Sequence, residues 1–187
     1  MLFRSLQGLR LTGRTPFPLR LLVALAAGSA YAIAFPPHDV APVAVVATSA
    51  LLLIVRGQGP ARGALFGFGF GLTAFGLLLS WISRFGALPW SALVLLSASY
   101  VAVFGATLPF VVRGRHPAID AIATAALWTL IAWVRGHWPL GGLTWGSLAS
   151  TQVDLPLGHA LPYAGTWGTE FLVALAVALL AASATRR

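Results

Sequence analysis

Long apolar runs are the feature that most constrains what this chain can fold into. Six of them, separated by short turns rich in Pro, Gly or Arg, take up most of the 187 residues. A helix needs about 20 apolar residues to cross the hydrocarbon core of a bilayer, and several runs approach that length. No polar face recurs at helical spacing, as it would in a soluble helix. The runs cover about residues 19–35, 40–55, 63–82, 90–112, 118–134 and 167–184.

Composition supports the same fold class. Hydrophobic residues make up 58% of the chain and charged residues only 9%, and the mean hydropathy is +0.86. A soluble domain has about 25% charged residues. The sequence therefore predicts an all-α integral membrane protein with about six transmembrane helices.

The basic residues are all arginines, and they give a net charge of +8. They lie at the ends of the apolar runs rather than on one basic face, so we expect no nucleic-acid partner. With six spans, ten of the twelve arginines fall on one side, and only Arg84 and Arg135 fall on the other. The positive-inside rule then predicts that both termini are cytoplasmic. Residues 1–18 would form a basic cytoplasmic N-terminus, and residues 19–187 a polytopic helical membrane domain.

One long outer loop, rich in Gly, Pro and Trp, is predicted between Arg135 and about Thr166. A loop of this length is usually functional or disordered, and its aromatic and apolar residues argue against disorder. A segment that lies along the membrane surface or re-enters it fits better. Gly141 and Gly142 are its expected structural positions. Most tryptophans map to the outer ends of the runs, as in an interfacial aromatic belt, and Trp128 lies deeper.

Two further patterns concern packing rather than chemistry. Pro36 and Pro37 predict a tight turn that ends the first helix and starts the second. Gly63, Gly67 and Gly71 repeat at the four-residue spacing that lets membrane helices approach closely.

Few residues could carry chemistry. The chain has no cysteine, which excludes disulfides, thiolate metal sites and a cysteine nucleophile. Its four histidines show no metal-ligand spacing, so neither a metal site nor a cofactor is predicted. Asp39 is expected to cap the second helix, and Asp120 lies in the first turn of the fifth. Glu170 lies deeper and is a functional candidate that could pair with Arg84 or Arg135.

Arg135 leaves two interpretations open. It could be an interfacial anchor whose stem lies along apolar surface, or it could bind a lipid phosphate or a carboxylate through its two-pronged guanidinium. The candidate residues for lipid or substrate contact are Arg135, Trp138, Trp145, Trp81 and Glu170.

Several stretches together resemble the N-terminal membrane part of apolipoprotein N-acyltransferases. The strongest joins residues 127–128 and 133–136 to Gly-Gly-Leu-Thr-Trp at 141–145 and Gln-Val-Asp-Leu-Pro-Leu at 152–157. Residues 34–42, 67–71 and 85–90 match in the same order. The resemblance covers nearly the whole chain.

This resemblance implies a bacterial inner-membrane protein that works on phospholipid and on the N-terminus of lipoproteins. Members of the family transfer an acyl chain from the phospholipid to the amine of a diacylglyceryl-cysteine. The acyl group passes through a cysteine thioester in a Glu-Lys-Cys triad, which belongs to an extracytoplasmic nitrilase-like domain.

The chain departs from this family pattern in two ways. It has neither the Cys nor the Lys of the triad, so no catalytic residue is assigned and no activity is expected from the chain alone. Ala132 stands where the family usually has glutamate, and Leu143-Thr144 where it usually has Phe-Pro. A truncated protein, a fragment, a membrane half served by a nitrilase-like domain in trans, and a decayed paralogue all fit. A non-catalytic lipid-binding anchor and, less well, a small transporter are the alternative functions.

Overall fold

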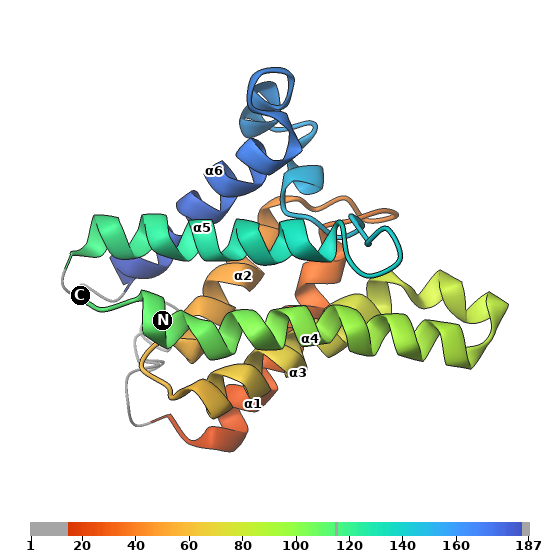
Figure 1. Ribbon diagram of the computed structural model, residues 1–187, viewed down its shortest axis with the longest axis horizontal. Helices are drawn as coiled ribbons and strands as arrows, with labels where there is room; N and C mark the ends of the chain where they lie inside the picture. The colour runs from red at the N-terminus through yellow and green to blue at the C-terminus, as the bar shows by residue number, and fades with distance from the viewer. Residues whose placement is uncertain (1–14, 115, 185–187) are drawn as a thin grey trace, which may run out of the picture.

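Six α-helices, joined by turns and three short 3-10 helices, form the part of the chain described by the computed structural model, residues 15–114 and 116–184 (Figure 1). The basic residues predicted at the extreme N-terminus, positions 1–14, and at 185–187 lie outside the described residues. The α-helices are α1 (Phe17–Ile33), α2 (Pro42–Val55), α3 (Pro60–Leu78), α4 (Ala87–Val111), α5 (Pro117–Arg135) and α6 (Leu161–Ala184). The 3-10 helices are η3 (Ser80–Phe85), η4 (Ala149–Gln152) and η5 (Pro156–Ala160).

Each α-helix corresponds to one predicted apolar run. Proline occupies the first or second position of α1, α2, α3 and α5, where its missing N–H costs no hydrogen bond. α3, α4, α5 and the segment Pro156–Ala184 are long and apolar enough to cross a membrane. α1 and α2 have 17 and 14 residues, or about 26 and 21 Å at 1.5 Å per residue. The predicted all-helical fold is therefore confirmed, and its four long apolar helices fit a membrane protein.

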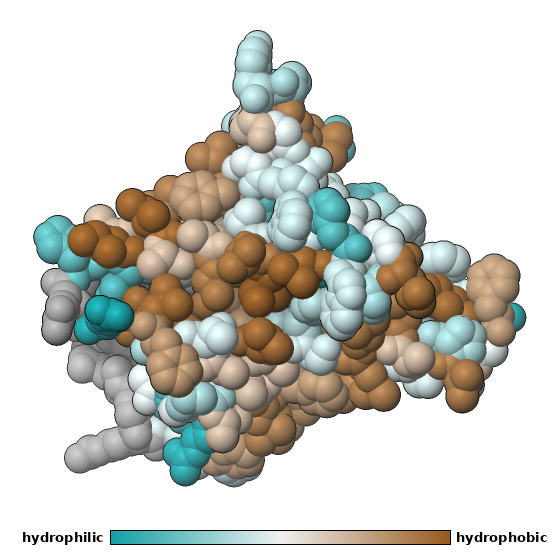
Figure 2. Space-filling model, viewed as in Figure 1, coloured by the Kyte–Doolittle hydropathy of each residue, from teal (hydrophilic) through white to brown (hydrophobic). Residues whose placement is uncertain are grey.

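The packing order of the helices departs from the chain order at α2, which contacts α1 and α6 more than it contacts α3. α3 lies between α1 and α4, and α5 lies between α4 and α6 (Figure 1). Phe66 and Phe70 of α3, Phe104 of α4 and Tyr31 of α1 are among the largest fully buried side chains. The face seen in Figure 2 is largely hydrophobic along the helices, as expected for a surface in contact with lipid.

The glycines of α3 pack against α4, as their spacing predicts. A Cβ at Gly67 would lie 2.2 Å from the Val101 carbonyl oxygen, and one at Gly63 would lie 2.2 Å from that of Gly105. Neither position can carry a side chain unless the helices separate. These glycines therefore fix the distance between α3 and α4.

Three local expectations were inaccurate. The third run ends as an α-helix at Leu78, and η3 follows it. The α6 segment starts at Leu161, ahead of its predicted start, but non-helical backbone at Gly165 (φ 65°) interrupts it. Asp39 does not cap α2: the N-cap is Ala41, with no side-chain cap, and Asp39 has a left-handed φ of 54°.

Candidate functional site

The two ends of the helix bundle differ in structure. α1 and α3 begin, and α6 ends, at one end, which we call the terminal end. At the opposite end, which we call the loop end, residues 136–160 fold over the helix tips. All five residues predicted to contact lipid or substrate belong to the loop end, but the structure divides them into two groups.

Arg135 belongs to the buried group. It is the last residue of α5 and is only 6% exposed. Its Nη1 donates to the carbonyl oxygens of Leu143 (3.0 Å) and Trp145 (2.6 Å), and its Nη2 to that of Gly146 (3.4 Å). The guanidinium also lies 5.0 Å from the centroid of the Phe75 ring. Arg135 thus holds the loop against the helices, a role that neither sequence interpretation described.

Two tyrosines bind the same loop. The Tyr31 hydroxyl donates to the carbonyl oxygen of Gly146 (3.0 Å), and the Tyr100 hydroxyl donates to that of Trp138 (2.5 Å). Gly146 has a φ of 77°, and a Cβ there would lie 2.7 Å from Cδ2 of Leu78. The loop can therefore approach the helix tips this closely only with glycine at that position.

Glu170 is the other buried charged residue among the five candidates, with no exposed surface. One carboxylate oxygen accepts from Nε1 of Trp128 (2.8 Å), and the other accepts from the backbone N–H of Ala149 (2.7 Å). Glu170 thereby joins α5, α6 and η4. These two groups, rather than Arg84, are its hydrogen-bond partners.

Arg135 and Glu170 line one small cavity of about 30 Å³ together with Tyr31, Trp128 and Ala132. Each of the two is held by its own hydrogen bonds, Arg135 to the loop carbonyls and Glu170 to Trp128 and Ala149. A cavity of this size suits a water molecule, not an acyl chain. We name Arg135, Glu170, Tyr31 and the partly buried Trp128 the buried clamp, because together they hold the loop against the helices.

The three candidate tryptophans form the exposed group. Trp81, Trp138 and Trp145 are 48%, 65% and 52% exposed, and the rings of Trp81 and Trp145 lie 6.1 Å apart. Trp145 also lines a groove of about 550 Å³ between the loop and the turn that joins α1 to α2. Its other walls include Phe35, Pro36, Asp39, Val153 and Asp154. We name this the loop-end groove.

The predicted structural positions Pro36, Pro37, Gly141 and Gly142 lie in two different turns. Pro36 is in the groove wall, next to Pro37. Gly141 and Gly142 have positive φ values of 91° and 78°. A Cβ at Gly142 would lie 2.1 Å from the carbonyl carbon of Gly136, so the chain doubles back on itself there. Among the described residues, no group of three or more His, Asp or Glu side chains could hold a metal ion.

Sequence reasoning missed two members of the buried clamp. Trp128 was set apart by its depth, but nothing in the sequence joined it to Glu170, 42 positions away. Tyr31 lies 115 positions from its acceptor, Gly146, and carried no signal beyond its polar hydroxyl in an apolar run.

These features define the class of the protein: an all-helical membrane protein whose long loop is held to the helix tips by buried polar and charged side chains. The chain matches the apolipoprotein N-acyltransferase N-terminal domain over residues 27–179. It is 34% identical to the apolipoprotein N-acyltransferase of Photobacterium profundum over 90% of this chain, and 37% identical to that of Pseudomonas putida over 85%. The chain therefore belongs to the apolipoprotein N-acyltransferase family. It spans about a third of the length of these relatives, 34% in both cases.

Proposed function

We propose that this chain is the membrane-embedded part of an apolipoprotein N-acyltransferase in the bacterial inner membrane. In this proposal the loop-end groove receives the diacylglyceryl-cysteine terminus of a lipoprotein. The observation that carries it is the groove itself. It holds about 550 Å³ and combines apolar and aromatic walls with two carboxylates, at the end where the family's matching loop folds over the helices.

The groove suits a ligand that is both apolar and cationic. Phe35, Trp145 and Val153 offer apolar surface, and Asp39 and Asp154 offer negative charge. An acylated peptide with a free N-terminal amine has both properties, since the ordinary pKa of an α-amino group leaves most of it protonated at neutral pH. An anionic phosphate would instead be repelled by the two carboxylates.

The chemical step needs a group that this chain does not contain. Transfer through a thioester requires a thiolate, and the sequence has no cysteine. We therefore propose that the chain binds and orients lipid substrates, and that a nitrilase-like domain supplies the nucleophile, in the same protein or in trans.

An acyl-transfer assay tests this division of labour. The chain is reconstituted in liposomes that contain phospholipid with a radiolabelled acyl chain and a diacylglyceryl-cysteine peptide. We expect no label in the peptide beyond that in protein-free liposomes. Transfer by the chain alone would contradict the proposal.

A relative's full-length enzyme serves as the positive control in the same liposomes. Adding that relative's catalytic region to the chain separates a catalytic membrane half from a non-catalytic lipid-binding anchor. A membrane half is expected to raise acyl transfer by the added region, whereas an anchor would leave its rate unchanged.

A further inference from the structure

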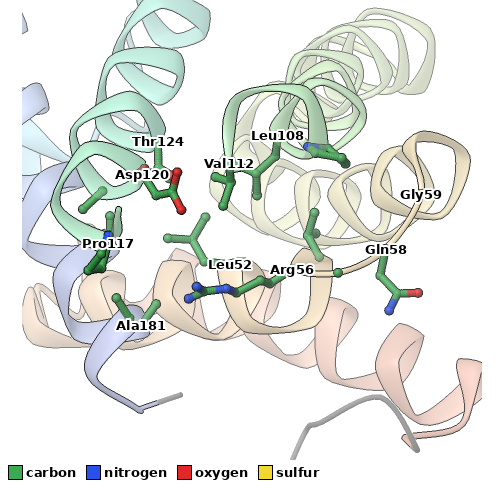
Figure 3. A pocket seen from close by; sticks show the side chains of 16 residues that line it. Leu52, Arg56, Gln58, Gly59, Leu108, Val112, Pro117, Asp120, Thr124 and Ala181 are labelled. Atoms are coloured by element: carbon green, nitrogen blue, oxygen red, sulfur yellow. Dashed lines mark hydrogen bonds between the residues drawn. The ribbon is translucent and has the colours of Figure 1, made fainter. Parts of the chain in front are cut away.

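A second cavity, of about 340 Å³, lies at the terminal end, far along the bundle from the loop-end groove. It is walled by α2, α4, α5 and α6 and by the turn that follows α2 (Figure 3). Apolar side chains form most of the wall: Leu52, Val55, Leu108, Val112, Ala178 and Ala181. Its volume lies within the range of small-ligand sites.

Two side chains of opposite charge face this cavity. In Figure 3 the Arg56 side chain extends along its lower edge from the end of α2, and the Asp120 carboxylate points in from the first turn of α5. Asp120 is only 8% exposed, and its oxygens accept from the backbone N–H groups of Arg113 (3.1 Å) and Gly114 (2.8 Å). A carboxylate offers about four acceptor positions, so this one can accept further hydrogen bonds.

The combination of charges with an apolar wall selects among ligands. A guanidinium binds phosphate through two N–H groups at once. A buried carboxylate attracts an ammonium group and repels additional phosphate. The apolar wall is formed by ends of α2, α4, α5 and α6; α4, α5 and the segment that contains α6 are long and apolar enough to cross a membrane, and α2 is a shorter apolar helix. A phosphate and a primary amine joined to an acyl chain would satisfy all three features.

We propose that this cavity binds a phospholipid whose headgroup carries a primary amine, such as phosphatidylethanolamine. Arg56 contacts its phosphate, Asp120 accepts hydrogen bonds from its ammonium, and the wall of Leu52, Leu108 and Ala181 covers the start of an acyl chain. This lipid is bound at the end opposite the proposed acyl-transfer surface, so it acts as a structural partner between α2 and α5 and not as the acyl donor.

Native mass spectrometry of the full chain tests the proposal with three phospholipids of identical acyl chains. We expect phosphatidylethanolamine to bind about tenfold more tightly than phosphatidylcholine or phosphatidylglycerol. The choline ammonium has no N–H to donate, and phosphatidylglycerol has no cation for Asp120. Equal binding of the three lipids would overturn the proposal. Displacement of the lipid by millimolar glycerophosphoethanolamine would show that the site takes the free headgroup instead.

Matched variants assign the contacts. Arg56→Gln should weaken phosphatidylethanolamine binding about tenfold, whereas Arg62→Gln, an exposed arginine at the same end, should leave it unchanged. Asp120→Asn should remove the preference for phosphatidylethanolamine over phosphatidylcholine.

Ala181→Phe provides an independent test, because Asp120 also binds the turn before α5. The phenylalanine fills the cavity and leaves both charged groups in place. Unchanged lipid binding by Ala181→Phe, or equal effects at Arg56 and Arg62, would contradict the site. Trp145→Ala, at the loop-end groove, should not alter this preference.

Discussion

At the scale of single residues, the Glu170 carboxylate is the most constrained group at the loop end. Both of its oxygens accept N–H donors, and the two donors come from α5 and η4. A fully buried carboxylate is tolerated only when it is bonded in this way. Glu170 therefore contributes to the order of the loop rather than to chemistry at a surface.

Glu170→Gln should lower stability in detergent by about 1–3 kcal/mol, because the amide nitrogen faces an N–H donor that then has no acceptor. Thermal unfolding followed by circular dichroism measures the loss. Trp128→Phe removes one donor, and the double variant should lose less than the sum of the two single variants. Strict additivity would show that the Trp128–Glu170 hydrogen bond contributes nothing.

Arg135→Ala should release the loop without unfolding the helices, since three loop carbonyls lose their donor. Removing the donor of a buried, charge-assisted hydrogen bond costs about 1–3 kcal/mol. We expect faster hydrogen exchange over residues 143–152 and an unchanged helical circular dichroism spectrum. Arg84→Ala is the matched control, because Arg84 is an exposed arginine at the same end. Equal rates of hydrogen exchange in the two variants would contradict the role of Arg135 in holding the loop.

The sequence singled out the two buried charged residues of the loop end but not their hydrogen-bond partners. Arg135 and Glu170 stood out because ionisable side chains are rare in apolar helices. Their acceptors and donors are mostly backbone groups of the loop, and the fold that brings a carbonyl such as that of Gly146 to Arg135 leaves no local pattern. Trp145 was foreseen as an interfacial residue, but the groove that it lines depends on the turn at Pro36, over 100 positions away.

At the scale of elements, the contact between α3 and α4 shows what the sequence can predict well. The four-residue glycine spacing is local, and it specified a close helix contact before the partner helix was known. The approximate positions of the helices also followed from the apolar runs, although α3 ends and α6 begins earlier than predicted. The interruption of α6 at Gly165 was missed, because one glycine in an apolar run does not reveal its φ.

Gly67→Ala should therefore destabilise the bundle, whereas Gly76→Ala on the same helix should not. A Cβ at Gly67 meets the Val101 carbonyl oxygen at 2.2 Å, and a Cβ at Gly76 has nothing within 4 Å. We expect a loss of about 1–3 kcal/mol for the first variant and a gain of up to about 1 kcal/mol in helix propensity for the second. Denaturation in mixed micelles compares them. Equal stabilities would show that α3 and α4 are not held at the distance described.

At the scale of the whole molecule, the arginine distribution predicts that the terminal end faces the cytoplasm and the loop end the opposite side. The absence of cysteine makes this simple to test. Leu140→Cys, at a fully exposed loop position, should react with an impermeant maleimide in intact spheroplasts. Ala61→Cys, at the exposed start of α3, should react only after the membrane is opened. The reverse pattern would invert the topology.

Family membership and the loop-end groove together predict that the chain binds a diacylglyceryl-cysteine peptide. Its most direct test is the binding of a fluorescent diacylglyceryl-cysteine peptide to the chain in nanodiscs, with wild type and Trp145→Ala measured side by side. We predict saturable binding to wild type that weakens about tenfold in Trp145→Ala, since a large aromatic side chain in a binding site contributes about 1–3 kcal/mol. Trp138→Ala, outside the groove, should bind as wild type does. Binding that does not saturate, or that is the same in wild type and Trp145→Ala, would contradict the account.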